Sequence, residues 1–246
     1  LKFLWLKQLI FIFNEINPLI MRNIILTILA IAIGIPSVLA QNLTGAYIAK
    51  NGDDSHLILM VDGYISHSIF SNDTYKSTQG GTYKVENNNL VVVCEYDDKN
   101  AENIGNTHQF PLEIGTNTIN IQGVPFQKQT VKAQGLDGLW RITGRKTNDG
   151  MQTIQRGDRK TIKILVDGFF QWIAINPAQK GFYGTGGGKY TFDKDIYQEN
   201  ITFFSRDNSR IGASLNFEGK IEDGQWHHSG KSSKGDPIHE IWSRDK

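Results

Sequence analysis

An internal repeat is the feature that most constrains the fold of this chain. The segment LILMVDGYISHSIF (57–70) resembles IKILVDGFFQWIAI (162–175), and the shared Val-Asp-Gly lies 105 residues later in the second copy. GGTYKV (80–85) matches GGKYTF (187–192) at an offset of 107 residues, so the second copy carries a small insertion between the two matches. Such self-similarity indicates one structural unit present twice.

The repeat also sets the predicted domain boundaries. LTGAY (43–47) resembles LDGLW (136–140) near the start of each copy. The 107-residue offset continues downstream in the pairs Gly105 and Gly212, Phe110 and Phe217, Ile114 and Ile221, and Gly123 and Gly230. We therefore expect a first repeat over 41–130 and a second over 135–246, joined through QKQTVKAQG.

Each copy reads as a series of short strands. Asp167-Gly168 and Asp223-Gly224 both stand between apolar runs, and Asp-Gly in that position is a strong hairpin signal. No helical period continues for long after Gln41. With about seven or eight strands per copy, the sequence predicts an all-β protein whose copies form small antiparallel barrels or strongly curved sheets.

The glycine-rich segment GFYGTGGGKY (181–190) poses the question of a nucleotide-binding loop. A phosphate-binding loop needs Gly-Lys followed by Ser or Thr and a helix, but Lys189 is followed by YTF, which is typical of a strand. The first copy shares only Gly-Gly-x-Tyr with it. We expect a bend or bulge in a strand and predict no cofactor.

Residues 1–40 have the pattern of an upstream segment and a signal peptide. Met21-Arg22 precedes the apolar run IILTILAIAIGIP, and SVLA supplies small residues before a cleavage point after Ala40. We expect Met21 to be the true start and the protein to be secreted or periplasmic, with the signal peptide at about 21–40. Alternatively, both apolar runs form a membrane anchor, and an uncleaved N-terminal segment is the one membrane contact we predict.

Charge and cysteine content exclude several functions. Without residues 1–40 the formal charge changes from +1 to −1, because Lys2, Lys7 and Arg22 are lost together with Glu15. A chain without basic excess is poorly suited to neutralise phosphates, so we expect no nucleic-acid partner. Cys94 is the single cysteine, which excludes an intramolecular disulfide and a cysteine-cluster metal site. We predict no metal site.

Short motifs in the second copy resemble those of bacterial secreted lipocalin-like domains, a group largely without assigned function. These motifs are GLW (138–140), YQE (197–199), GQW (224–226) and HEIWSR (239–244). The resemblance implies a barrel whose cavity holds a small hydrophobic ligand. It also implies that Trp140 packs at the closed end of the barrel beneath Arg244; Tyr47 takes the place of this tryptophan in the first copy.

Strand alternation predicts which side chains of the second copy face its interior. An aromatic wall with a few convergent polar groups is typical of a ligand pocket. The candidate ligand-binding residues are Phe170, Trp172, Tyr190, Glu199, Phe203, Trp226, His228, Glu240 and Trp242. Alternatively, the aromatic rings fill a closed core and the polar groups face water.

Four of the five tryptophans lie in the second copy, where Trp172 aligns with His67 and Trp226 with Ile119. This asymmetry suggests that the second copy binds and the first supports it. The leading hypothesis is a secreted protein that binds a small hydrophobic or amphipathic ligand. One alternative is an enzyme that acts inside the barrel through Glu199, His228 or Glu240. Another is an envelope protein-interaction module with solid barrels.

Overall fold

The structure is a computed structural model that describes residues 43–232 and 235–245. The predicted signal peptide and both N-terminal apolar runs lie outside these residues. Within the described ranges, no helix combines the length and apolar character needed to cross a membrane. These residues form β-strands joined by turns and by three short 3-10 turns, at Ala101–Asn103, Pro177–Gln179 and Asn208–Arg210.

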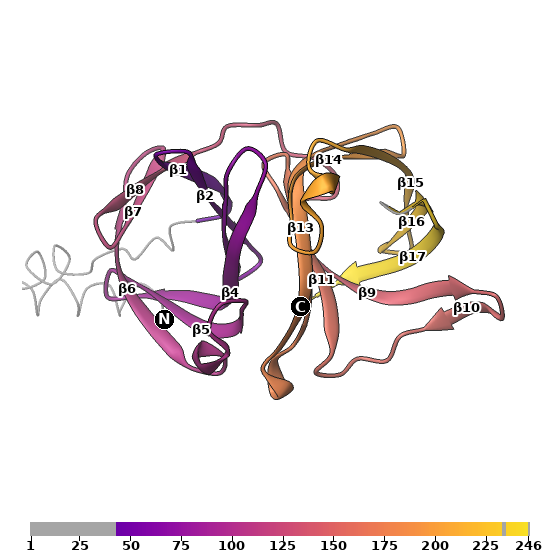
Figure 1. Ribbon diagram of the computed structural model, residues 1–246, viewed down its shortest axis with the longest axis horizontal. Coiled ribbons are helices and arrows are strands. Elements are labelled where there is room, and N and C mark those ends of the chain that lie inside the picture. The colour runs from indigo at the N-terminus through magenta and orange to yellow at the C-terminus, as the bar shows by residue number, and fades with distance from the viewer. Residues whose placement is uncertain (1–42, 233–234, 246) are drawn as a thin grey trace, which may run out of the picture. The chain divides into compact units, whose positions relative to one another are not determined.

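The first repeat folds into a closed antiparallel barrel, drawn from indigo to pink in Figure 1. Each strand pairs with the next along the chain, and β1 closes the barrel by pairing with β8. The strands are β1 (Gly45–Asn51), β2 (Asp54–Val61), β3 (Tyr64–Phe70), β4 (Tyr75–Glu86), β5 (Asn89–Asp97), β6 (Thr107–Ile114), β7 (Thr118–Ile121) and β8 (Val124–Lys128).

The second repeat forms a barrel of the same kind, closed by pairing of β9 with β17. β10 pairs with β9 alone among the described strands and extends outside the barrel as a hairpin. The strands are β9 (Gly138–Thr147), β10 (Gly150–Thr153), β11 (Lys160–Val166), β12 (Phe169–Asn176), β13 (Gly181–Asp193), β14 (Ile196–Phe204), β15 (Ser214–Glu222), β16 (Gln225–Lys231) and β17 (Pro237–Arg244). The prediction of two tandem antiparallel barrels is confirmed.

The glycine-rich segment is part of β13, as a strand bend and not as a phosphate loop. The register of β13 with β14 shifts between Gly187 and Gly188. In the first barrel, the register of β4 with β5 shifts at the equivalent place, between Gly80 and Gly81. A Cβ at Gly188 would collide with the carbonyl oxygen of Asn200. Glycine is therefore required where the strand bulges and bends towards closure of the barrel.

Three hydrophobic clusters make up the core. One fills part of the first barrel and another the second barrel. The third lies between the barrels and joins Leu57, Leu59 and Val61 of β2 to residues of β11 and β12, including Ile162 and Ile164. Because β2 is buried on both faces, its sequence is a continuous apolar run instead of an alternating one.

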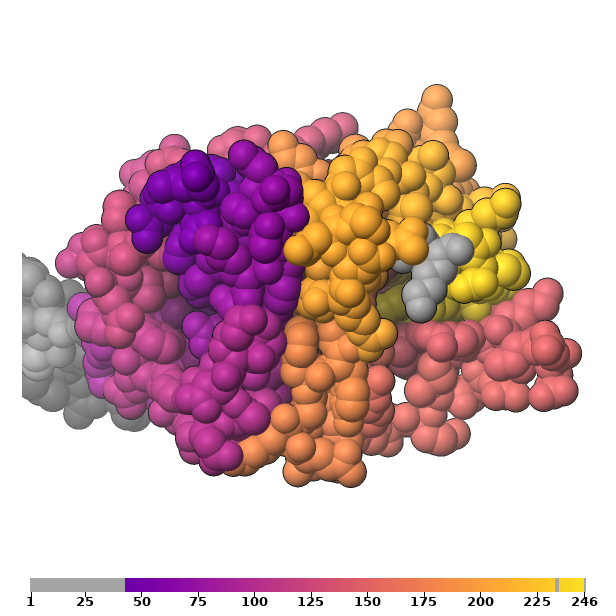
Figure 2. Space-filling model, viewed as in Figure 1, coloured from indigo at the N-terminus to yellow at the C-terminus, as the bar shows by residue number. Residues whose placement is uncertain are grey.

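The hairpin turns of the two repeats make reciprocal contacts between the barrels. Asp62 Oδ2 accepts a hydrogen bond from the Leu139 N–H at 2.8 Å, and Asp167 Oδ2 accepts one from the Ala46 N–H at 3.1 Å. Both aspartates are in the left-handed region, with φ of 50° and 49°. In the face drawn in Figure 2 the atoms of the two barrels are in contact.

Candidate ligand-binding cavity

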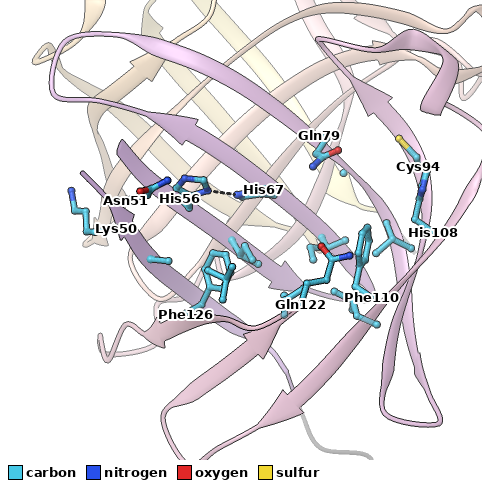
Figure 3. A pocket seen from close by; sticks show the side chains of 18 residues that line it. Lys50, Asn51, His56, His67, Gln79, Cys94, His108, Phe110, Gln122 and Phe126 are labelled. Carbon is cyan, nitrogen blue, oxygen red and sulfur yellow. Dashed lines mark hydrogen bonds between the residues drawn. The ribbon is translucent and has the colours of Figure 1, made fainter. Parts of the chain in front are cut away.

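The interior of the first barrel contains a cavity of about 490 Å³. This volume lies within the range of about 300–1,000 Å³ that is common for small-molecule sites. Residues from all eight strands of this barrel and from the turn after β7 line it. Figure 3 shows their side chains from close by. The apolar lining residues are Ala49, Ile58, Ile65, Leu90, Val92, Phe110, Ile121, Val124 and Phe126.

One part of the barrel is filled and the rest is not. Tyr47, Met60 and Leu112 belong to the buried cluster that packs against one side of the cavity. Beyond them, interior positions carry aliphatic side chains such as Ile58 and Val92. Side chains of this size are too short to meet across the barrel, so they leave a void between them. A void with an apolar lining favours apolar ligands.

Two histidines face each other within the cavity wall. His56 on β2 and His67 on β3 are joined by a hydrogen bond of 3.2 Å between His56 Nδ1 and His67 Nε2, and their rings stack at 5.3 Å. Burial and the neighbouring His56 lower the pKa of His67 to about 4. His67 is therefore neutral near pH 7.

The remaining polar lining includes one lysine and no carboxylate. Lys50 donates a hydrogen bond to Ser55 Oγ at 2.6 Å at the end of the β1–β2 hairpin. Burial raises the pKa of the Cys94 thiol to about 11, so this cysteine is not a thiolate near pH 7. His108 Nε2 is buried and has no hydrogen-bond partner within the described residues. Asn51, Gln79 and Gln122 complete the polar lining.

The nine residues that the sequence predicts as ligand-binding lie elsewhere, and none of them lines this cavity. Phe170, Tyr190, Trp226 and Trp242 are buried in the cluster that fills the second barrel, and Trp172 packs against it partly exposed. Tyr190 donates a hydrogen bond to Asp137. The rings thus pack against one another in a core, which was the alternative to a ligand pocket in the interpretation of the sequence. Their ligand-binding role stays a prediction.

Phe203 points away from the interior of the second barrel. It belongs to the cluster between the barrels and stacks on Phe70 of the first barrel, with ring centroids 5.0 Å apart. The cause is the bulge in β13–β14, where Gly187 pairs with Phe203 but Gly188 with Ile201. One extra residue reverses the face on which the following side chains lie.

The three polar candidates are brought close together around a buried lysine. Lys163 Nζ lies 2.9 Å from Glu199 Oε1, and both side chains are almost fully buried. The Tyr197 hydroxyl also donates to Glu199 Oε1, at 2.9 Å. The Lys163 ammonium lies 5.1 Å from the ring centroids of Tyr197, Trp226 and Trp242, within cation–π range.

Glu240 and His228 lie beside this ion pair. His228 Nδ1 is 3.5 Å from Glu240 Oε2, and Trp242 Nε1 donates to the same oxygen at 3.2 Å. Burial acts to raise the pKa of Glu240, but His228, Lys163 and Arg145 outweigh it and lower this pKa to about 2. Burial and Lys163 lower the pKa of His228. A carboxyl with so low a pKa is a poor proton donor near pH 7.

Over 43–232 and 235–245, no three or more His, Cys, Asp or Glu residues are grouped so as to hold a metal ion. A more open recess of about 590 Å³ lies along β14–β16, lined in part by Ile196, Leu215 and Phe217. It also contains none of the nine predicted residues.

His56 and the cavity around it were not predicted from the sequence. A signal was present, because positions filled by tryptophan in the second copy carry His67 and Ile119 in the first. Smaller side chains on the same barrel leave interior volume empty.

No protein-family model matches this chain, and no curated protein is similar to it in sequence. The lipocalin-like family therefore stays a prediction drawn from short motifs.

Proposed function

We propose that the protein is a secreted or periplasmic, lipocalin-like binding protein, and that its first barrel holds a small, mostly apolar ligand. The observation that carries this proposal is the cavity of about 490 Å³ with an apolar lining inside a closed barrel. Apolar surface moved from water into such a site contributes roughly 25 cal/mol per Å². The second barrel acts as a packed support.

Two adjacent valines on β5 provide a matched test. Val92 lines the cavity and is 8% exposed, whereas Val93 is on the other face of the strand and is 41% exposed. Val92→Phe adds a ring to the empty volume, and Val93→Phe adds the same ring on the outside. We expect Val92→Phe to abolish or strongly weaken binding and Val93→Phe to leave it unchanged.

The measurement is native mass spectrometry of the protein exported by a bacterial host, before and after exposure to a lipid extract. A discrete excess mass that is lost on denaturation, present in wild type and in Val93→Phe but absent in Val92→Phe, supports the proposal. Retention of the same mass by Val92→Phe contradicts binding in the cavity. Absence of any excess mass in all three proteins contradicts a ligand-binding function.

A further inference from the structure

The two histidines of the cavity wall are brought together by strand pairing. The register places His67 on β3 opposite Ile58 on β2, two residues after His56 and on the same face of that strand. The two histidines are therefore diagonal neighbours across the sheet, and both line the cavity. They are 11 residues apart in the chain, and Figure 3 shows the hydrogen bond that joins their rings. No local motif of the sequence indicates this pair.

The spacing of the two ring nitrogens is also the spacing that a metal ion imposes. Zinc binds imidazole nitrogen at about 2.0–2.1 Å in a tetrahedral arrangement, which places two nitrogens on one ion roughly 3.3 Å apart. His56 Nδ1 and His67 Nε2 lie 3.2 Å apart. An ion can therefore take the place of the proton between the rings with little movement of either ring.

Both imidazoles can offer a lone pair to the same ion. In the hydrogen bond, one of the two facing nitrogens carries a proton and the other accepts it. A neutral imidazole holds a single proton on either of its two nitrogens. When the donating ring carries that proton on its outer nitrogen, both facing nitrogens are free to bind the ion, and no proton is released. Neutral imidazole is the form that binds metals, and His67 is neutral near pH 7.

The rest of the lining leaves the other coordination positions of such an ion open. The described lining contains neither aspartate nor glutamate, and Figure 3 shows Cys94 and His108 away from the histidine pair. Structural zinc sites usually have four protein ligands and catalytic sites three, whereas this pair supplies two. Water or an anion from solution therefore completes the coordination shell and offsets the charge, and the ion is exchangeable.

We propose that His56 and His67 bind a divalent late first-row transition-metal ion, such as Zn²⁺ or Cu²⁺, inside the first barrel. Imidazole suits these ions, whereas Mg²⁺ and Ca²⁺ prefer oxygen ligands. The second barrel cannot form the same site, because Thr161 and Trp172 take the equivalent positions of its repeat. This metal site is additional to the proposed binding of an apolar ligand and does not depend on it.

The experiment is titration calorimetry of the exported protein, freed of metal by dialysis against a chelator, with Zn²⁺ and with Mg²⁺. We expect one Zn²⁺ per chain and no binding of Mg²⁺. Loss of an indirect partner of a metal ligand costs about 10–100-fold in affinity, so removal of a ligand in His67→Gln should weaken Zn²⁺ binding by at least about 10-fold. His56→Thr should have the same effect. It introduces the residue that the second repeat carries at this place, so the barrel should still fold.

Two other histidines provide matched controls. His108→Gln changes a different histidine of the same cavity. His239→Gln changes a pair on the outer face of the second barrel, where the rings of His227 and His239 lie 6.0 Å apart. Both variants should bind Zn²⁺ as the wild type does. The electron paramagnetic resonance spectrum of bound Cu²⁺ should show coupling to two nitrogens in the wild type and to one in His67→Gln.

Two results would overturn this proposal. If the wild type binds no Zn²⁺, the two histidines form a hydrogen bond only. If His239→Gln loses Zn²⁺ and His67→Gln retains it, the ion binds on the outer face of the second barrel. Neither result bears on the apolar ligand, which is tested separately by the excess mass in the Val92→Phe and Val93→Phe variants.

Discussion

The two barrels share a strand order and differ in what fills them. At positions 107 residues apart the first barrel has aliphatic side chains and the second has large or polar ones. The pairs are Leu90 and Tyr197, Val92 and Glu199, Ile119 and Trp226, and Ile121 and His228. The first barrel encloses a cavity, whereas the second packs these residues against one another. Side-chain volume on a common scaffold thus determines which barrel has room for a ligand.

The surroundings of the aromatic residue in the first strand of each barrel have diverged far less. Trp140 Nε1 donates to the Leu136 carbonyl at 2.8 Å, and the Arg244 guanidinium lies 4.0 Å from the Trp140 ring. In the first barrel the Tyr47 hydroxyl donates to the Leu43 carbonyl at 3.1 Å. Lys128 takes the place of the arginine, 5.8 Å from the Tyr47 ring. Both repeats therefore keep an aromatic ring beneath a cation, although the contents of the two barrels differ.

The largest effect is expected from breaking the Lys163–Glu199 ion pair of the second barrel. This pair takes the positions that aliphatic side chains have in the first barrel. Lys163→Met leaves Glu199 buried without its counter-charge, and removal of one partner of a buried pair costs about 3–5 kcal/mol. Urea unfolding followed by circular dichroism measures this loss in the free energy of unfolding.

The first barrel supplies the control for this variant. It carries Ile58 and Val92 where the second barrel carries Lys163 and Glu199. The double variant Lys163→Ile/Glu199→Val removes both charges, so it should be more stable than Lys163→Met alone. If Lys163→Met unfolds at the wild-type urea concentration, the ion pair does not stabilise the interior of the second barrel.

A smaller effect is expected at the polar contact between the barrels. Gln171 accepts from Ser66 Oγ at 2.6 Å and donates to Thr78 at 3.1 Å and Thr185 at 3.0 Å, and all four side chains are buried. Gln171→Ala leaves these hydroxyls short of partners, at a cost of about 1–3 kcal/mol. Gln152 on β10 is exposed, and Gln152→Ala should cost far less.

The same unfolding experiment tests whether the barrels depend on each other. Within the described residues, every tryptophan lies in the second barrel, so tryptophan fluorescence reports the unfolding of that barrel. Circular dichroism reports the unfolding of both barrels. The apolar cluster between the barrels predicts coincident transitions by the two probes. Separate transitions would show that the interface does not couple them.

Sequence patterns predicted the barrels because turns and repeats are local signals. Asp167-Gly168 and Asp223-Gly224 predict two hairpins, and the structure confirms both. The cavity was not predicted, since a row of aromatic residues has the same pattern whether it lines a pocket or fills one. Phe203 illustrates a second limit, because strand alternation does not extend across a bulge that only pairing reveals.

Near neutral pH, the smallest effect is a pH dependence that arises from His67 in the first barrel and His228 in the second. Burial and His56 hold the pKa of His67 at about 4 in the folded protein, against about 6.5 in an unfolded chain. Between these values the unfolded state binds more protons. The contribution of His67 to stability is therefore complete above about pH 6.5 and is lost as the pH falls towards 4, by at most about 1.4 kcal/mol per pH unit.

Replacing single histidines separates the two barrels. Urea unfolding at a series of pH values should show a smaller loss on acidification for His67→Gln than for the wild type. Part of the loss should remain, because burial and Lys163 also lower the pKa of His228 in the second barrel.

Glu240, with a pKa of about 2, affects stability only below about pH 4.3, the unfolded value for a glutamate, so its effect lies at lower pH. His227→Gln, on the partly exposed face of β16, is the control for replacing a histidine outside the core. An unchanged profile in His67→Gln would mean that the cavity admits enough water to solvate the imidazolium, and the first barrel would then differ from the second in hydration as well as in volume.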